Sequence, residues 1–220
     1  MEQEFLRTGL SGSTLTAWLA RHDLVERAAP PLLLEGLGQW LGWTEAIALS
    51  AGLHGTAEAA PRAPSLPALQ REFERVQQSL RRAIDGDDAA PPPSRRRPAA
   101  EPAVADEGFA PHRQRYTVLQ QAMETAVGAL RAQARAAVAR LSPRLAAVDA
   151  VMETMLAERE QLLLARLPTL LETHFERLRR AHADTAWLPR FRADLQQLAC
   201  AELQLRLQPV QGLMNTLSPR

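Results

Sequence analysis

Lysine is absent from this chain of 220 residues, in which all 26 basic residues are arginine. A phosphate-binding P-loop needs a lysine, so that class of nucleotide site is excluded. Cysteine occurs once, at Cys200, which excludes an intrachain disulfide and leaves histidine and carboxylate as the ligands of any metal site. Long apolar runs are missing as well: the longest uncharged stretch near the start, 46–57, is well short of the ~20 residues that cross a bilayer. We expect no transmembrane segment.

The opening residues, 1–5, do not resemble a secretory leader. They are acidic and contain neither a basic nor an apolar region. Together with the single cysteine, this predicts a cytoplasmic protein.

Alanine and leucine dominate the composition, with 39 and 35 residues. Hydrophobic residues make up 46% of the chain, aromatic residues 5% and charged residues 23%. This composition is typical of a soluble all-α protein, because alanine and leucine have high helix propensities. It excludes wholesale disorder and a disulfide-stabilised scaffold.

A stretch rich in proline, alanine and acidic residues, 85–111, divides the chain. Proline biases its neighbourhood away from helix, and the stretch offers too little apolar surface to offset the entropy of ordering. We therefore predict a disordered linker at 85–111, an N-terminal tryptophan-rich helical unit at 1–84, a C-terminal helical bundle at 112–208 and a flexible tail at 209–220.

The N-terminal unit contains the signals of short helices. Ser13 is placed to cap a first helix, Pro31 to open a second and Thr44 to start a third. Apolar residues at helical spacing predict a fourth helix over about 66–84. The tryptophans Trp18, Trp40 and Trp43 are expected to form its core, and an exposed Trp43 would instead mark a partner-binding site.

The C-terminal part carries apolar residues seven apart, the spacing of a coiled-coil-like seam. Ser142 and Pro143 fall inside this pattern and predict a cap and a break between two helices, while Pro168 and Pro189 begin two more. We therefore predict four helices in an elongated antiparallel bundle. The seam consists of two series: Tyr116, Met123, Leu130 and Ala137; and Val127, Ala134, Leu141, Val148, Met155 and Leu162.

No catalytic, cofactor or metal motif is present in the sequence. His174 and His182 share one predicted helix, but no glutamate stands three residues before either, as a di-metal bundle requires. Cys200 on an apolar helix face indicates packing, and the carboxylates at Glu153 and Glu160 indicate exposed ion pairs. We predict neither an enzyme nor a cofactor, although catalytic groups that meet only in the folded state would leave no such motif.

Charge differs between the two parts. Residues 1–60 carry 3 arginines and 7 acidic residues, whereas 112–220 carry 15 arginines and 10 acidic residues. The arginines make a candidate surface for an acidic partner, and a solvated helix face is the simpler alternative. The candidate partner-binding residues are Trp40, Trp43, Arg131, Arg135, Arg177, Arg179 and Arg180.

Several phrases in the chain resemble an uncharacterised proteobacterial family catalogued as domain of unknown function (DUF) 3348. The resemblance covers most of the chain except the linker and the last ~30 residues. Low-complexity segments such as the linker commonly lack such a resemblance. The phrases that carry it lie at 7–15, 38–50, 109–116, 120–124, 149–153 and 167–178.

The resemblance supplies no activity, cofactor or catalytic residue. It implies an association with membrane proteins similar to MotA/TolQ/ExbB proton channels and to OmpA-like cell-wall-binding proteins, which places the chain at the cytoplasmic side of an envelope complex, peripheral to the inner membrane. We therefore predict a non-enzymatic scaffold that binds protein partners or its own copies as a homo-oligomer. The alternative is peripheral binding to anionic membrane or to nucleic acid through the arginine-rich helices. Of these two, nucleic acid is the less expected partner, because the positive charge is far below that of a typical nucleic-acid-binding domain.

Overall fold

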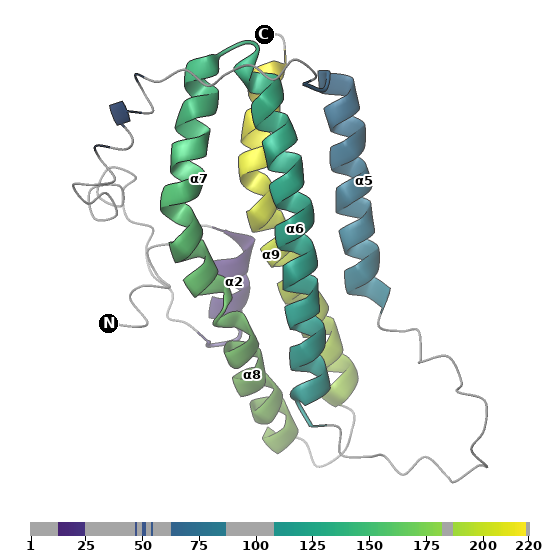
Figure 1. Cartoon of the computed structure of the whole chain (residues 1–220). Helices are drawn as coiled ribbons and strands as arrows, with labels where there is room; N and C mark the ends of the chain where they lie inside the picture. The colour runs from purple at the N-terminus through teal and green to yellow at the C-terminus, as the bar shows by residue number, and fades with distance from the viewer. Residues whose placement is uncertain are drawn as a thin grey trace.

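The computed structural model describes residues 13–24, 63–86, 108–181 and 187–218, together with positions 47, 50, 51 and 54. Within these residues the chain forms α-helices and no strand, which confirms the all-α fold (Figure 1). None of the described helices is long and apolar enough to cross a membrane. The helices are α2 (Thr14–Arg21), α5 (Leu66–Asp85), α6 (Ala110–Ala139), α7 (Pro143–Leu164), α8 (Leu167–Ala181) and α9 (Trp187–Leu217).

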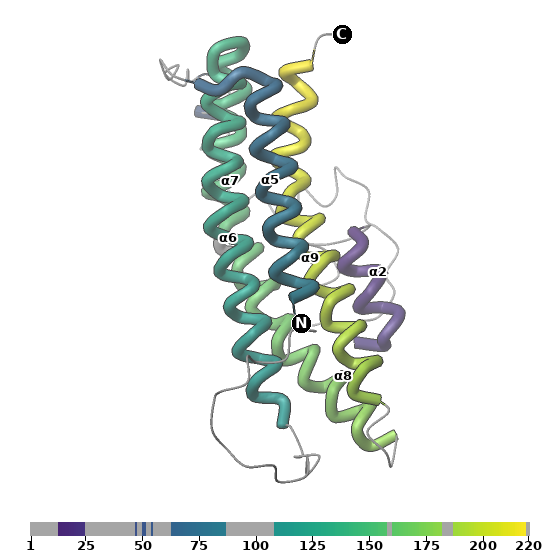
Figure 2. Tube along the Cα trace, turned by 90° about the vertical axis from the view of Figure 1, so that its right-hand side faces the viewer, coloured from purple at the N-terminus to yellow at the C-terminus, as the bar shows by residue number. Residues whose placement is uncertain are grey.

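Two long helices, α6 and α9, form the centre of an elongated bundle. They have 30 and 31 residues, so each is roughly 45 Å long at ~1.5 Å per residue. Helix α5 packs on both, α7 packs on α6, and α2 packs on α9. Figure 2 shows α2 and α8 beside the lower part of α9, with α5 along its upper part.

The helix boundaries follow the capping signals of the sequence. The Ser13 hydroxyl accepts a hydrogen bond of 3.2 Å from the Thr16 N–H, and the Ser142 hydroxyl accepts one of 3.3 Å from the Leu145 N–H. Pro143 occupies the first turn of α7, where its missing N–H removes no helical bond. The predicted break between α6 and α7 is therefore confirmed, and the two helices run antiparallel (Figure 1).

The described helices of the N-terminal part do not close a core of their own. Leu15 and Leu19 of α2 and Leu69 and Ile84 of α5 are buried in the same core as the C-terminal helices. Each of these helices has one apolar face, which must be buried against another element, and α6 and α9 supply that surface. Residues 87–107 of the predicted linker and the predicted helices that begin at 31 and 44 lie outside the description, apart from the four isolated positions.

Helix α9 continues beyond residue 208, where the sequence predicts a flexible tail. Pro209 lies inside this helix and cannot donate the backbone hydrogen bond expected there. Val210 and Leu213, which follow it, are buried in the core. This burial offsets the cost of the proline, so the predicted tail is corrected to helix as far as Leu217.

The predicted seam is buried along α6 but not along α7. Tyr116, Met123 and Leu130 are almost completely buried. In contrast, Leu141 remains 70% exposed and Leu162 62% exposed. In the second heptad series, Val127 and Ala134 on α6 are therefore buried, whereas Leu141 and Leu162 are not.

A buried carboxylate joins α6 to α9. Glu202 is completely buried and accepts hydrogen bonds from the Tyr116 hydroxyl (2.7 Å), Arg206 Nε (2.9 Å) and Gln120 Nε2 (3.2 Å). Burial raises the pKa of Tyr116 well above its ordinary value, and the nearby Glu202 charge adds to the effect. Tyr116 therefore stays neutral, and its hydroxyl donates a hydrogen bond to the carboxylate.

We expect Tyr116→Phe to destabilise the protein by about 2 kcal/mol, because it removes a hydrogen bond to a buried charge. Urea unfolding followed by circular dichroism measures this loss. Thr117→Ala, on the exposed side of the same helix, is the control and should cost much less. Equal losses for the two variants would contradict the structural role of the tyrosine.

Candidate functional site

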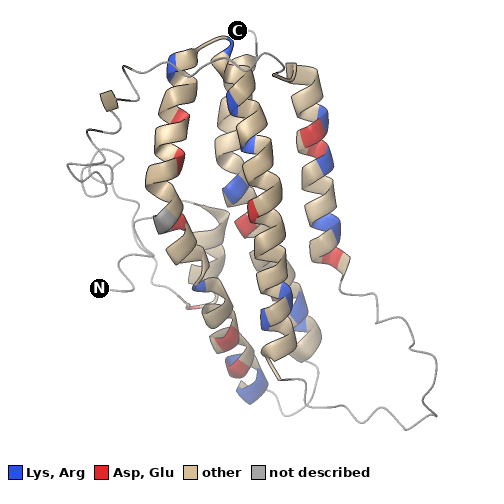
Figure 3. Cartoon of the chain, in the orientation of Figure 1, with Lys and Arg blue, Asp and Glu red and all other residues tan. Residues whose placement is uncertain are grey.

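Arginines of α6 and acidic residues of α7 form an ion network between the two helices. Arg131 lies 2.7 Å from Asp149, and Arg135 lies 2.5 Å from Glu153. The crossed distances are 3.8 Å from Arg131 to Glu153 and 3.6 Å from Arg135 to Asp149. Figure 3 shows basic residues on α6 and acidic residues on the neighbouring α7. The network directs the charged side of α7 toward α6.

Two of the predicted partner-binding arginines are therefore engaged within the chain. The side chains of Arg131 and Arg135 are only 14% and 20% exposed. The sequence predicts that Glu153 pairs with a neighbour on its own helix. In the structure it pairs instead with Arg135 of α6. Glu160 likewise reaches another helix, 3.8 Å from Arg206 of α9.

An apolar stripe lies beside the charged side of α7. From Leu141, in the turn before α7, to Met155 its residues follow the alternating four and three spacing of a coiled-coil seam, and Leu162 stands seven residues further on. Leu141 and Leu162 are largely exposed, Leu145 is 37% exposed, and the others are half-buried. We call this set the α7 stripe; it consists of Leu141, Leu145, Val148, Met152, Met155 and Leu162.

A groove of about 340 Å³ lies between α6, α7 and α9. Gln120, Arg131, Glu153, Glu160 and Arg206 contribute to its lining, so its walls carry charges of both signs. Among the described helices, α6 is the principal packing partner of α7. With this one strong partner, α7 is less buried than α6 and α9.

A second polar feature, the histidine cluster, consists of His22, His174 and Asp194. His22 ends α2, while His174 and Asp194 come from α8 and α9. His174 Nε2 lies 2.8 Å from Asp194 Oδ2, and His22 Nε2 lies 4.0 Å from Asp194 Oδ1. Potential ligand atoms of the three residues all lie within 4.8 Å of one another. This set of two imidazoles and one carboxylate could hold a metal ion.

The surroundings of the cluster are aromatic on one side and cationic on another. The Trp18 and His22 rings lie 4.3 Å apart, and the His22 and His174 rings 4.6 Å apart. Arg177 contacts His174 Nδ1 at 3.0 Å. A guanidinium can only donate, so Nδ1 accepts and Nε2 carries the proton that is directed at Asp194.

Burial lowers the pKa of His22, and this effect exceeds the opposing attraction of Asp194. His174, Arg177 and Arg21 lower this pKa further through their charges. His22 is therefore predominantly a neutral imidazole at neutral pH, which is the form that binds metals.

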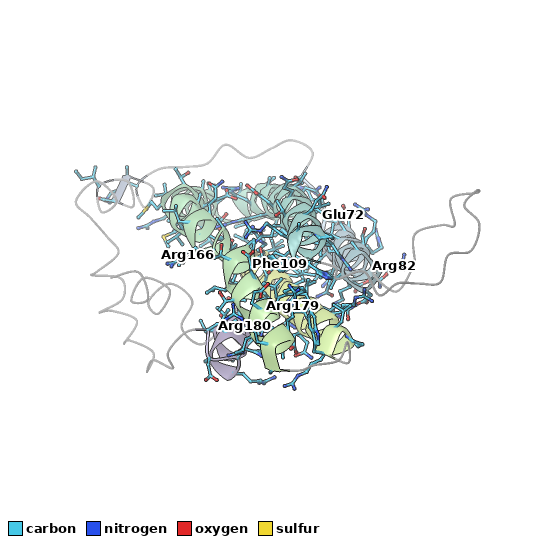
Figure 4. All side chains as sticks on the ribbon, turned by 90° about the horizontal axis from the view of Figure 1, so that it is seen from below. Glu72, Arg82, Phe109, Arg166, Arg179 and Arg180 are labelled. Carbon is cyan, nitrogen blue, oxygen red and sulfur yellow. The ribbon has the colours of Figure 1, made fainter. Side chains whose placement is uncertain are left out.

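The remaining predicted site residues are placed as follows. Arg180 of α8 is 82% exposed and lies 4.0 Å from Glu176, which also lies 3.9 Å from Arg179. Figure 4 shows both arginines on α8, viewed from below. Trp40, Trp43 and His182 lie outside the described residues.

Cys200 is half-buried, and burial is the main reason that its pKa is raised. A raised pKa lowers the fraction of thiolate, the nucleophilic form of cysteine. Cys200 therefore fits the packing role predicted for it better than a nucleophilic one.

Sequence reasoning identified His174 but not the other two members of its cluster. His22 and Asp194 stand on separate helices, and neither forms a short metal-binding motif with His174. Only the packing of α2 and α8 against α9 brings them together.

We expect Asp149→Asn to destabilise the protein by about 1–2 kcal/mol, because it leaves Arg131 and Arg135 with less compensation at a partly buried contact. Chemical unfolding in low salt measures the loss. Glu124→Gln, an exposed position on α6, is the matched control and should be close to neutral. The same small effect in both variants would show that the network does not hold α7.

The lowered pKa of His22 makes stability depend on pH. The unfolded chain takes up a proton more readily at this residue, so stability is lost as the pH falls from 7.5 through the ordinary histidine value of about 6.5. Unfolding of the metal-free protein at pH 7.5 and pH 5.5 should show a larger loss in the wild type than in His22→Gln. A pH effect of the same size in both would exclude this residue as its source.

No curated protein and no solved structure matches the chain. One family model does match, over residues 1–219, and its description is "Protein of unknown function (DUF3348)". This match covers both the N-terminal part and the long bundle. The chain belongs to the DUF3348 family.

Proposed function

We propose that this protein is a non-enzymatic helical scaffold that binds protein partners through the α7 stripe. The observation that carries the proposal is the orientation of α7, which turns its charged side to α6 and leaves Leu162 largely exposed. Leu141, in the turn before α7, is also largely exposed. Helices of globular proteins ordinarily turn their apolar stripe to the core. An apolar stripe outside the core is a typical contact surface for another helix.

The first occupant that we propose is a second copy of the chain. A heptad stripe is complementary to another heptad stripe, and each copy supplies one. Branched and flexible apolar residues, such as Val148 and Met152, can interlock across such a seam. The formal net charge of +1 adds little repulsion between copies.

The dimer would then present further surfaces to an envelope complex. The family resemblance suggests partners of the proton-channel-like (MotA/TolQ/ExbB) and OmpA-like kinds, and we propose a cytoplasmic position beside the inner membrane. The exposed arginine Arg180 on α8 is available to an acidic partner there.

The alternative, binding to anionic lipid through the arginine-rich helices, has less support. Arg131, Arg135 and Arg206 all lie close to carboxylates of the chain. If the alternative were correct, binding to anionic vesicles would weaken strongly with added salt.

The double substitution Leu141→Glu and Leu162→Glu tests the α7 stripe. We expect the wild type to sediment as a dimer at ~50 µM and the double variant to dissociate at least tenfold more readily, since charges would be buried in the seam, at a cost of about 1.4 kcal/mol per tenfold change. Sedimentation velocity over a concentration series measures this difference.

Val118→Glu is the matched control, because Val118 is 57% exposed on α6 but lies outside the stripe. It should leave the dimer intact, and circular dichroism should show that all variants keep their helices. A wild type that remains monomeric over the whole series, or a control that dissociates as readily as the double variant, would refute the proposed dimer.

A further inference from the structure

We propose that the histidine cluster is a binding site for a divalent first-row transition metal ion, with His22, His174 and Asp194 as its protein ligands. The site is independent of the α7 stripe and of the proposed scaffold function. Two of the ligands are deeply buried, since His174 is 1% and Asp194 7% exposed. The third, His22, closes the cluster from the end of α2.

The ligand set suits ions such as Zn²⁺. Two imidazoles and one carboxylate occur in mononuclear zinc and iron(II) sites, whereas Mg²⁺ and Ca²⁺ prefer sets made of oxygen alone. Three protein ligands leave at least one position for water. Trp18 and Phe191, whose rings lie 6.0 Å and 6.2 Å from the ring of His174, form apolar walls around these ligands.

Metal binding would exchange one set of contacts for another. The hydrogen bond of 2.8 Å between His174 Nε2 and Asp194 Oδ2 would be replaced by bonds of about 2.0–2.2 Å from each atom to the ion. The His22 imidazole, whose Nε2 is now 4.0 Å from Asp194, would move toward the same point. Because His22 lies at the end of a short helix, this movement requires little change in the core.

The protons of His174 can be accounted for. The proton now on Nε2 must leave when that nitrogen donates its electron pair to the ion, and it moves to Nδ1 of the same ring. Nδ1 then no longer accepts a hydrogen bond, so Arg177 must turn away. Arg177 is an exposed residue of α8 and can turn into solvent.

Arg177 is therefore a competitor of the metal. It stabilises the tautomer that cannot bind through Nε2, and its positive charge opposes a second cation nearby. Removal of this arginine should strengthen binding, whereas a cluster that serves only as a hydrogen-bonded core would give no such response. This opposite effect of two neighbouring substitutions distinguishes a metal site from a structural contact.

The test uses the full chain, freed of metal with EDTA and dialysed at pH 7.5. Titration calorimetry with Zn²⁺ should give one ion per chain, and Co²⁺ should give the visible absorption of a site with nitrogen and oxygen ligands. His22→Gln should weaken Zn²⁺ binding by about tenfold or more, and Arg177→Met should strengthen it several-fold. His54→Gln, which removes an exposed histidine from outside the cluster, should bind as the wild type does.

Circular dichroism and the thermal midpoint without metal show whether each variant folds. His22→Gln alters a partly exposed position, so the test does not depend on substituting the buried Asp194. Absence of stoichiometric binding at 100 µM Zn²⁺ would overturn the proposal. Binding that is unchanged in His22→Gln, or that weakens in Arg177→Met, would overturn the assigned ligands. None of these results depends on whether the α7 stripe forms a dimer.

Discussion

The pairing of α6 with α9 around the buried Glu202 is the contact on which the other helices depend. A carboxylate that is completely buried must be compensated, and Tyr116, Gln120 and Arg206 provide three directed hydrogen bonds to it. These bonds require a particular register between two helices of some thirty residues, whereas apolar contacts alone tolerate sliding. Once the register is fixed, the surfaces that receive α5 and α2 are fixed as well.

Helix α7 is attached by a different kind of interaction. Its contact with α6 includes the pairs Arg131 with Asp149 and Arg135 with Glu153, while Ala146, Leu163 and Leu164 near its two ends are buried in the core. Partly buried ion pairs of this kind contribute more to the orientation of the two helices than to the stability of the fold. The consequence is that part of the apolar surface of α7, including Leu145 and Leu162, stays outside the core.

The sequence predicted those features that depend on local interactions. Ser13 and Ser142 cap helices as expected, and the regular spacing of Leu69, Val76 and Leu80 marks the buried face of α5. It failed where the outcome depends on distant partners. The chain from residue 209 on was predicted to be a flexible tail, but burial of Val210 and Leu213 accompanies its continuation as helix to Leu217.

The orientation of α7 and the histidine cluster could not be predicted for a related reason. The heptad series predicts that Val148, Met155 and Leu162 face the bundle, whereas the ion pairs with arginines of α6 turn another side of α7 inward. His22, His174 and Asp194 carry no mutual spacing signal, because they meet only after three helices have packed. Only the assembled bundle could therefore indicate the candidate sites.

Helix α7 is held at both ends as well as at its centre. At its start, the short turn from α6 and the Ser142 cap fix its first residues. At its end, only Ala165 and Arg166 separate it from α8, whose Leu167, Leu171 and Phe175 are completely buried. A helix restrained in this way loses little conformational entropy when a partner binds, so that more of the energy of apolar contact is available for association. The same ionic contacts that keep the α7 stripe out of the core therefore also prepare it for binding.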